Sequence, residues 1–505
     1  MTTSIQSCWL AAVAAAMLIA GCGKVDAPKS EAPVEPDVSN LVLICIDTVR
    51  WDTWWVPERF GFTDAFTPWA ARSQVMSRAV AAAPWTVPSV GSVLTGLYPS
   101  QHGGGLFSGE VANLDTEVPS AIAPAAPTLA GMLAEAGLDT VAVSAHPWFS
   151  ANYGLERGFE ELHQRGGAEK VTSRGMQWLD EDADGRFFLY LHYMDVHDPH
   201  LDLAGSRETV AAMDDERREL LMDAAPDAAC DDPDSVMCTR FLSYAEATLA
   251  LRERIAEVLE GLEQRGLMHD TLVAIYSDHG EEFHDHVEIS RARDEDPRGI
   301  HGFGHGQSLY QELLQVPLLL WHPDFGGREI VEPVSLVDVV PSTMDWLGVP
   351  LPEDYDLPGV SFADSVALGK DAPFEWSEDQ LAWGEESDRP LFASGIAYGP
   401  EQMAVIDGTA KLIWHQVDNT REYYDLAADP PERDPELDMP ARVADRLDDD
   451  LDRYFGWFDS RDYLPPELTD EVVEKLKGVG YLQGVESGAK DADEGGSEEH
   501  PTDGS

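Results

Sequence analysis

Four residues in this sequence have the types and local settings that metal-assisted ester chemistry requires. Asp47 and the pair Asp278 and His279 each follow an apolar run, and Thr86 stands at the start of a predicted helix within residues 83–96. Two carboxylates and an imidazole can bind a divalent cation and leave a position open for a hydroxyl. We therefore predict that these four residues form a metal site with Thr86 as the nucleophile. Taken alone, Thr86 is also explained as a helix N-cap, and Asp278 as a turn residue.

Histidines supply a second candidate group. The segment HYMDVHDPH contains Asp195 and His197, and HGFGHG contains His301 and His305. A lone histidine is usually structural, but most of the 15 histidines lie between residues 192 and 305, which favours a site. We predict that His197 and His305 are catalytic. Two interpretations remain open for Asp195, His197 and His301: they hold a second metal ion, or they form hydrogen bonds to the substrate.

The elements that must position these side chains follow from hydrophobic patterning. Unbroken apolar runs such as NLVLICIDT, RFFLYLHYMD and TLVAIYSDHG are typical of strands buried on both faces, and helical patterns separate them. This alternation predicts a three-layer α/β sandwich with a mostly parallel central sheet. Ligands bind at the carboxyl ends of strands in such sheets, which is where the polar residues follow. Alternating segments from residue 391 to 426 predict a small C-terminal α+β domain with an antiparallel sheet.

The N-terminal residues predict export. The apolar run WLAAVAAAMLIAGC is too short to span a bilayer comfortably, and its last four residues, Ile19 to Cys22, resemble the lipobox of bacterial lipoproteins. The resemblance implies cleavage before Cys22, a lipid on its sulfur and attachment to a bacterial membrane, namely the outer membrane if the source is Gram-negative. No Lys or Arg precedes the run, so an ordinary cleaved signal peptide is the alternative.

Composition shifts divide the chain into five predicted parts. They are a lipoprotein signal peptide (1–21), a flexible tether (22–38), an α/β catalytic domain (39–370), a linker with the small C-terminal domain (371–484) and a disordered acidic tail (485–505). In an exported chain, Cys230 and Cys238 are predicted to close a small loop as a disulfide, because they have no neighbours at metal-ligand spacing.

The charge balance restricts the partners. The chain has 93 acidic and 34 basic residues, which gives a net charge of −59. Such a surface repels nucleic acid, so we predict no nucleic-acid partner. An anionic substrate then needs strong local positive charge, which a bound metal supplies.

Six motifs, in order along residues 40–435, carry a resemblance to the sulfatase family within the alkaline phosphatase superfamily. They are LVLICIDTVRWD, APWTVPSVGSVLTGLYPSQHG, LYLHYMDVHDPH, IYSDHGEEF, GFGHGQSLYQELLQVPLLL and REYYDLAADPPERD. The resemblance implies a large α/β domain and a smaller domain around a four-stranded antiparallel sheet. It also implies that Asp47, Asp278 and His279 are metal ligands, that Thr86 occupies the catalytic position, and that two histidines hold the ester oxygens or protonate the leaving group. By position, these are His197 and His305.

Two departures from the family pattern alter the expected chemistry. Sulfatases of this family have Cys or Ser at the catalytic position, oxidised to formylglycine, with Arg four residues on, whereas this chain has Thr86 and Val90. The paired Asp-Asp of the first motif is Asp47-Thr48 here, so one carboxylate is missing. Fewer carboxylates and a histidine favour Mn²⁺ or Zn²⁺, with Ca²⁺ as the alternative.

These features predict a metal-dependent hydrolase or transferase that acts on an anionic ester, either a small molecule or one linked to glycan or lipid. Superfamily members with an unmodified threonine act on phosphoesters, so we predict a phosphodiester, phosphonate or phosphomonoester in preference to a sulfate ester. Two alternatives remain: an arylsulfatase-like hydrolase of sulfate esters, and a non-catalytic ester-binding lipoprotein.

Overall fold

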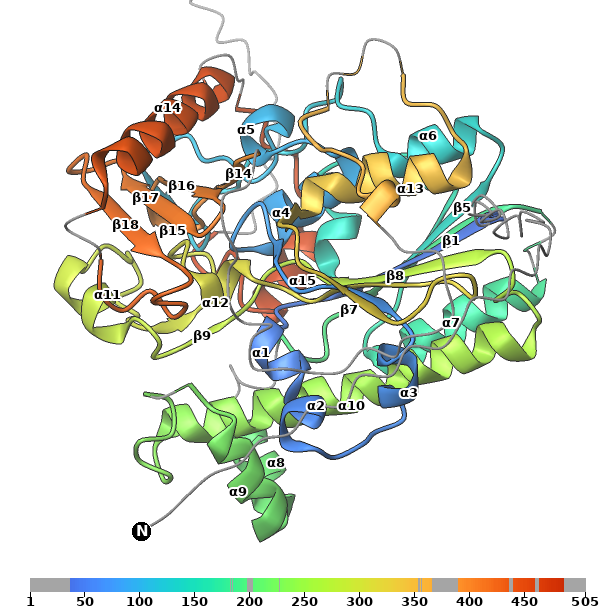
Figure 1. Cartoon of the computed structure of the whole chain (residues 1–505), viewed down its shortest axis with the longest axis horizontal. Coiled ribbons are helices and arrows are strands. Elements are labelled where there is room, and N and C mark those ends of the chain that lie inside the picture. The colour runs from blue at the N-terminus through green and yellow to red at the C-terminus, as the bar shows by residue number, and fades with distance from the viewer. Residues whose placement is uncertain are drawn as a thin grey trace, which may run out of the picture. The chain divides into compact units, whose positions relative to one another are not determined.

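A sheet of eight strands forms the centre of the protein, which we describe from a computed structural model (Figure 1). The structure describes residues 37–181, 183, 185–197, 203–226, 228–352, 355, 357–365, 389–435, 439–458 and 463–485. In spatial order, the strands are β12 (Arg328–Ile330), β2 (Gln74–Met76), β11 (Leu318–Trp321), β8 (Thr271–Ser277), β1 (Asn40–Ile46), β7 (Phe187–Tyr193), β5 (Asp139–Ser144) and β6 (Glu161–Gln164).

The middle of this sheet is parallel. Strand β1 pairs in parallel with both β7 and β8, and β5 pairs in parallel with β7 and β6, whereas β11 runs antiparallel to β8 and β2. Strand β12 is parallel to β2, so all of the eight strands except β11 run in the same direction, and their carboxyl ends lie at one edge. The predicted mostly parallel α/β sandwich is confirmed.

Helices cover both faces of the sheet because successive side chains of a buried strand point to opposite sides. In β1, Leu41 and Leu43 join the apolar core on one face, and Val42 and Ile44 join the core on the other. Figure 1 shows α4 (Thr86–Thr95), α6 (Leu129–Glu135) and α13 (Val339–Leu347) on one side of the sheet and α7 (Ala168–Glu181) and α10 (Val236–Gln264) on the other.

Shorter helices complete these layers. They are α1 (Trp51–Trp54), α2 (Val56–Phe60), α3 (Thr67–Ala70), α5 (Pro99–His102), α8 (Leu203–Ala212), α9 (Asp215–Asp223), α11 (Val287–Arg293) and α12 (Gln311–Leu314). Strands of two or three residues form three separate two-stranded sheets. They pair β3 (Ala79–Val80) with β13 (Val334–Ser335), β4 (Val111–Asn113) with β15 (Tyr398–Pro400), and β9 (Glu282–Phe283) with β10 (Phe303–Gly304).

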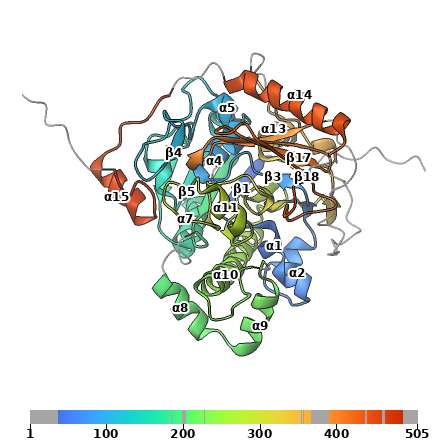
Figure 2. The ribbon, with the colours of Figure 1, turned by 90° about the vertical axis from the view of Figure 1, so that its left-hand side faces the viewer.

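The C-terminal part contains the predicted antiparallel sheet. Its four strands are β14 (Leu391–Ser394), β16 (Gln402–Asp407), β17 (Ala410–His415) and β18 (Arg421–Asp425), in that spatial order. Helix α14 (Ala441–Phe458) lies along this sheet (Figure 2), and α15 (Asp470–Gly478) ends the described chain apart from one loop. The predicted boundary near residue 370 falls outside the described residues and stays a prediction.

Several predicted features concern the rest of the chain. The structure contains the disulfide between Cys230 and Cys238, whose Cα atoms are 4.5 Å apart. The signal peptide, Cys22, most of the tether and most of the acidic tail lie outside the described residues. Among the described helices, none combines the length and apolar character that crossing a membrane requires.

Candidate active site

The ends of β1 and β8 bring the three predicted metal ligands together. Asp47 follows β1, and Asp278 and His279 follow β8, which pairs directly with β1. His279 Nε2 lies 3.6 Å from Asp47 Oδ1 and 3.5 Å from Asp278 Oδ2, and ligand atoms of the three residues lie within 4.8 Å of one another. All three side chains are completely buried.

The buried acceptor atoms of these groups that lack a donor indicate a cation site. Among the described atoms, Asp47 Oδ1 and Asp278 Oδ2 are buried carboxylate oxygens without a hydrogen-bond partner. The second oxygen of Asp278 accepts hydrogen bonds from the backbone N–H groups of Thr48 (3.3 Å) and His279 (3.0 Å). His279 Nδ1 donates to the Gly280 carbonyl (2.9 Å), so its Nε2 carries a lone pair. Two oxygens and one nitrogen therefore have acceptor capacity that a divalent cation would satisfy.

The pKa values of these side chains have the same cause. Burial, together with the charge of Glu281 and against the attraction of His305, raises the pKa of Asp47 to about 8. Burial and the charge of Asp47 raise the pKa of Asp278 well above its usual value. Burial lowers the pKa of His279 to about 4, which keeps the imidazole neutral and able to act as a ligand. The donor set therefore fits a metal ion, whose charge would restore both carboxylates to the ionised form.

Thr86 completes the group from the opposite side. Its Oγ1 lies 3.4 Å from His279 Nε2, and its side chain is 0% exposed. Thr86 is the first helical residue of α4, while Trp85 occupies the N-cap position and makes no side-chain capping bond. The simple N-cap explanation of Thr86 is therefore wrong. The hydroxyl instead lies at the positive end of a ten-residue helix, where negative charge is stabilised.

Thr48, which replaces the second aspartate of the family motif, has an unusual backbone. It adopts φ +62°, a left-handed conformation that is rare for a β-branched residue. Its hydroxyl donates to the Asp47 carbonyl (2.7 Å), and Tyr244 donates to the Thr48 carbonyl (2.7 Å). The strained turn is thus held from both sides, and it directs the Thr48 N–H to Asp278.

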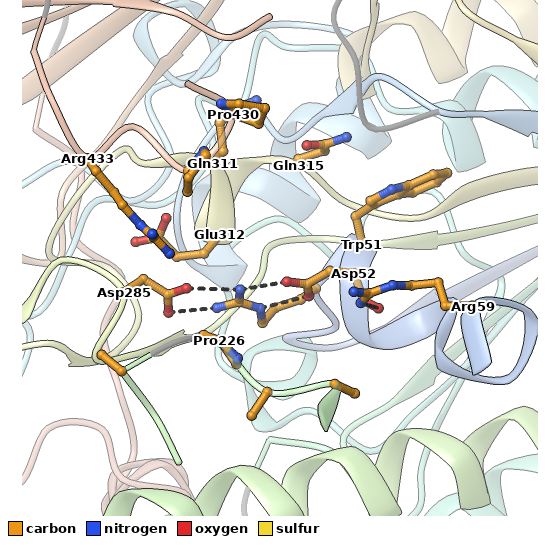
Figure 3. Close-up of a pocket in the computed structure, with 15 residues that line it drawn as sticks. Trp51, Asp52, Arg59, Pro226, Asp285, Gln311, Glu312, Gln315, Pro430 and Arg433 are labelled. Atoms are coloured by element: carbon orange, nitrogen blue, oxygen red, sulfur yellow. Dashed lines mark hydrogen bonds and ion pairs between the residues drawn. The ribbon is translucent and has the colours of Figure 1, made fainter. Parts of the chain in front are cut away.

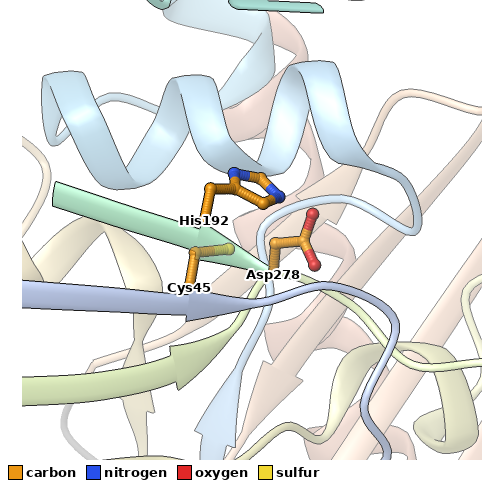
Figure 4. Close-up of side chains that lie close together, drawn as sticks. All are labelled: Cys45, His192 and Asp278. Carbon is orange, nitrogen blue, oxygen red and sulfur yellow. The ribbon is translucent and has the colours of Figure 1, made fainter. Parts of the chain in front are cut away.

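Two further histidines surround Asp47, and sequence analysis did not select them. His192, within β7, donates from Nε2 to Asp47 Oδ2 (3.1 Å), and His146, after β5, places its Nε2 3.6 Å from the same oxygen. Figure 4 shows His192 and Cys45 on neighbouring strands, close to Asp278. Burial lowers the pKa of His192 to about 4 and that of His146 well below its usual value. Both imidazoles are neutral, and His192 orients Asp47 through its hydrogen bond. Their positions at the ends of apolar strands are the signal that could have identified them.

The predicted catalytic histidines lie beside this group. The imidazoles of His197 and His305 have centroids 5.1 Å apart, and those of His279 and His305 are 4.6 Å apart. His305 Nδ1 donates to the buried carboxylate of Glu281 (3.2 Å), another residue that sequence analysis did not select. His197, Glu281 and His305 line a cavity of about 260 Å³.

The structure does not bring Asp195 and His301 into the group. Asp195 accepts a hydrogen bond from the backbone N–H of Ala168 (2.9 Å), at the first turn of α7. His301 Nε2 lies 3.4 Å from Asp294 Oδ1, next to α11. Their role in a second metal site stays a prediction.

A larger cavity, of about 450 Å³, lies away from these residues (Figure 3). Its lining includes Arg50, whose guanidinium pairs with both Asp52 (2.7 Å) and Asp285 (2.8 Å). Arg50, Asp52 and Asp285 are thus paired with one another, and none of the candidate site residues described above lines this cavity.

Comparison with known proteins gives a consistent family relationship. The family described as Sulfatase matches residues 39–349. The chain is 25% identical over 199 residues to the steryl-sulfatase of Rattus norvegicus, an alignment that covers 39% of this chain and 29% of the relative. It is 25% identical over 183 residues to the choline-sulfatase of Rhizobium meliloti (strain 1021), covering 36% of this chain and 30% of the relative. This chain therefore spans less than a third of the length of these curated relatives.

Solved structures share the fold over most of the chain. A structure from work on glycosaminoglycan metabolism by Bacteroides thetaiotaomicron has a TM-score of 0.60 and 19% identity, and the match covers 84% of this chain and 97% of that one. Another, solved in complex with its substrate D-glucosamine-2-N,6-O-disulfate, has a TM-score of 0.58 and 15% identity, with coverage of 84% and 99%.

Proposed function

Because the chain belongs to the sulfatase family, we propose that it is a metal-dependent ester hydrolase in which Thr86 is the nucleophile. The observation that carries this proposal is the convergence of Thr86 Oγ1, 3.4 Å from His279 Nε2, on two buried carboxylate oxygens without partners. An N-cap or a core threonine would not need unpaired carboxylates beside it, because burying such groups is costly.

The metal site would consist of Asp47, Asp278, His279 and the Thr86 hydroxyl. A divalent cation in this site lowers the pKa of a bound hydroxyl and offsets the charge of an anionic ester. Two carboxylates with one neutral imidazole favour Mn²⁺ or Zn²⁺ over Ca²⁺, which prefers a shell of oxygens. The backbone N–H groups at the start of α4 add positive potential on the same side as Thr86.

Thr86, His305 and His197 have separate roles in the proposed reaction. The Thr86 hydroxyl would give its proton to bulk water as its pKa falls. Its Oγ1 then attacks the central atom of the ester and forms a covalent ester with it, while the bond to the alcohol oxygen breaks. The Nδ1–H of His305 is fixed by Glu281, so the Nε2 of the protonated ring can give its proton to that oxygen. The Nε2 atoms of His197 and His305 face each other across a short gap, so His197 Nε2 can bind an oxygen of the acid group. Water then attacks the same central atom and gives one proton to His305 Nε2, while the bond to Thr86 Oγ1 breaks and the acid leaves.

The identity of residue 86 favours phosphoesters over sulfate esters. In sulfatases of this family, a hydrated formylglycine releases sulfate by elimination through its second hydroxyl. Threonine has one hydroxyl, so a sulfated Thr86 lacks this exit, whereas a phosphorylated Thr86 is open to attack by water at phosphorus. We therefore propose a phosphodiester, phosphonate or phosphomonoester as the substrate class.

Hydrolysis of a sulfate ester is the second candidate. The family and the names of the curated relatives favour it, since both relatives named above are sulfatases. It would require a release step for sulfate that Thr86 itself does not provide.

The test is a matched panel of aryl phosphate, phosphodiester, phosphonate and sulfate substrates, measured on the manganese-loaded and zinc-loaded protein. We expect phosphorus esters to be cleaved faster than the matched sulfate. Thr86→Ala should lose at least about 10³-fold in kcat/KM, as expected when a nucleophile is removed, and Thr86→Ser should retain measurable activity. A preference for sulfate that survives in Thr86→Ala would contradict the proposal.

A further inference from the structure

Tyr481 brings a hydroxyl into the candidate active site from far outside the family match. It follows α15, in the segment 479–485, which we call the Tyr481 loop, whereas the family match ends at residue 349. The Tyr481 hydroxyl lies 2.8 Å from His197 Nε2 and 3.2 Å from His305 Nε2. The side chain of Thr86 lies beside this hydroxyl. Two active-site imidazoles thus contact one phenol oxygen next to the proposed nucleophile.

This position separates Thr86 from the cavity. Tyr481, His197 and His305 line the 260 Å³ cavity, while Thr86 and the predicted metal ligands do not. Thr86 is 0% exposed, and Tyr481 is 3% exposed. An ester that enters the cavity therefore meets the tyrosine ring before it can reach the nucleophile.

The phenol oxygen also occupies the place that a substrate oxygen would need. Two imidazole Nε2 atoms and the nucleophile surround it, as they would surround an oxygen of a bound acid group. A tetrahedral acid group cannot share this space with a tyrosine hydroxyl, because protein interiors leave few voids larger than a water molecule. Binding and the described position of Tyr481 therefore exclude each other.

Backbone hydrogen bonds and buried side chains both attach the Tyr481 loop to the rest of the protein. Its backbone makes two hydrogen bonds to the segment after β4, from Leu482 N–H to the Leu114 carbonyl (3.2 Å) and from Gly484 N–H to the Asp115 carbonyl (2.7 Å). Leu482 adopts φ +55°, a left-handed conformation that costs a non-glycine residue about 1–2 kcal/mol. The Tyr481 ring packs on Trp148, with centroids 5.3 Å apart. Because Tyr481 and Leu482 are both buried, withdrawal of the loop exposes apolar surface, and binding of the acid group must supply that free energy. The strain at Leu482 lowers this cost.

We propose that Tyr481 is a displaceable plug, whose hydroxyl stands in for a substrate oxygen and whose loop withdraws when the acid group of an ester binds beside Thr86. The proposal rests on the proposed function for the identity of the ligand. In the closed state, the site binds no substrate. The apparent affinity is therefore the affinity of the open state multiplied by the fraction of molecules that are open. The loop thereby favours esters that bind tightly enough to displace it.

The first test is hydrogen–deuterium exchange of the manganese-loaded full chain with and without inorganic phosphate. We expect phosphate to raise the exchange rate of the amides of Leu482 and Gly484 several-fold, roughly threefold or more, while peptides from β1 and β8 are unchanged or protected. Slower exchange in the loop when phosphate is bound would overturn the proposal, because it would mean that the loop closes over the ligand.

The second test measures phosphate affinity in variants. Tyr481→Ala should bind phosphate about tenfold more tightly than the wild type, and Tyr481→Phe, which keeps the ring but loses the hydroxyl, should fall between them. Tyr463→Phe is the matched control: it lies in the same C-terminal segment, is 37% exposed and donates to the Val118 carbonyl, so its affinity should not change.

The outcomes separate this proposal from the proposed function. Tighter phosphate binding in Tyr481→Ala without turnover of any ester would support the plug and contradict the hydrolase. Weaker binding, or a lower kcat with unchanged KM in Tyr481→Phe, would overturn the plug and make Tyr481 a catalytic residue. If Tyr481→Ala binds no phosphate, there is no anion site behind the ring, and the proposal fails.

Discussion

At the scale of single residues, the two carboxylate oxygens of Asp278 have different roles: one accepts backbone hydrogen bonds, and the other is available to a metal ion. Oδ1 accepts two backbone hydrogen bonds, and Oδ2 has no partner. We expect Asp278→Ala to lose both metal content and activity, because removing a charged ligand from a compact site costs more than the ~10–100-fold that outer-shell losses cost. Asp278→Asn keeps the shape and one neutral oxygen, so it should bind metal partially.

Elemental analysis of the purified variants measures this effect. Asp195→Ala is the matched control, because Asp195 accepts a hydrogen bond at the start of α7 and should keep full metal content. Full metal occupancy in Asp278→Ala would show that the ligand assignment is wrong. Loss of metal in Asp195→Ala would instead support the prediction of a second ion.

The buried carboxylates give the metal-free protein a characteristic pH dependence. Burial raises the pKa of Asp47 to about 8, so the folded metal-free protein holds a proton there that the unfolded chain has lost. A raised pKa in the folded state means that stability falls as pH rises toward the folded pKa. Below pH 6.5, the histidines with depressed pKa values act in the opposite direction. Between pH 6.5 and 8, the carboxylate therefore changes the stability without the opposite effect of these histidines.

We expect the free energy of unfolding of chelator-treated protein to fall from pH 6.5 to 8, by up to about 1.4 kcal/mol per pH unit for each carboxylate involved. The metal-loaded protein should not show this fall, because both carboxylates are then ionised. Denaturant titrations of the two forms measure the difference. Parallel curves for the two forms would contradict a metal at Asp47 and Asp278.

Sequence reasoning found the residues that follow strands and missed those that depend on distant contacts. Asp47, Asp278 and His279 were predictable because apolar runs end directly before them. His192 lies inside an apolar run, and its role depends on the pairing of β7 with β1, which brings it to Asp47. Tyr481 reaches the same place through the docking of a C-terminal segment, and no local pattern encodes that contact.

At the scale of elements, the sheets were predictable for the same physical reason. Strands buried on both faces must be apolar throughout, so β1, β7 and β8 are visible as unbroken runs, and the alternation of β14 to β18 indicates a second, antiparallel sheet. Short strands such as β2 and β12 at the sheet edge were not predicted. Three residues are too few to show a hydrophobic pattern, and the two strands pair with each other across more than 200 positions of sequence.

A buried ion pair within the C-terminal part forms hydrogen bonds to the backbone of the catalytic part. Lys411 of β17 lies 2.6 Å from Glu432 and donates to the Leu309 carbonyl (2.7 Å), and Glu432 accepts from the Gln311 N–H at the start of α12 (2.6 Å). Both side chains are completely buried.

We expect Lys411→Met to lower the free energy of unfolding by about 3–5 kcal/mol, because it leaves Glu432 as an unpaired buried charge. The double variant Lys411→Met with Glu432→Gln should recover part of this loss, because it removes the charge as well. Denaturant unfolding measures both. Equal stability of the wild type and Lys411→Met would contradict the attachment.

At the scale of the whole molecule, the net charge of −59 bears on how the protein is held near a membrane. This charge repels an anionic bilayer surface, so retention there needs the lipid predicted on Cys22. We expect the wild-type protein to fractionate with membranes and to be released by detergent, with a blocked, lipid-bearing Cys22 in mass spectrometry. Cys22→Ser should be recovered without lipid in the soluble fraction.

The matched control is Cys45→Ser, because Cys45 is buried at the end of β1 and has no role in anchoring. It should fractionate like the wild type. Recovery of the wild-type protein in the soluble fraction, with an unblocked N-terminus other than Cys22, would contradict the anchor.

Mass spectrometry of the peptide containing residue 86 tests most directly whether Thr86 acts unmodified as a nucleophile. We expect an unmodified threonine at rest and one added phosphoryl group on Thr86 after rapid acid quenching of the metal-loaded protein with a phosphate ester. Thr86→Ala should give neither the adduct nor turnover. Turnover of esters by Thr86→Ala at the wild-type rate, with no adduct on the wild-type threonine, would show that Thr86 is not the nucleophile.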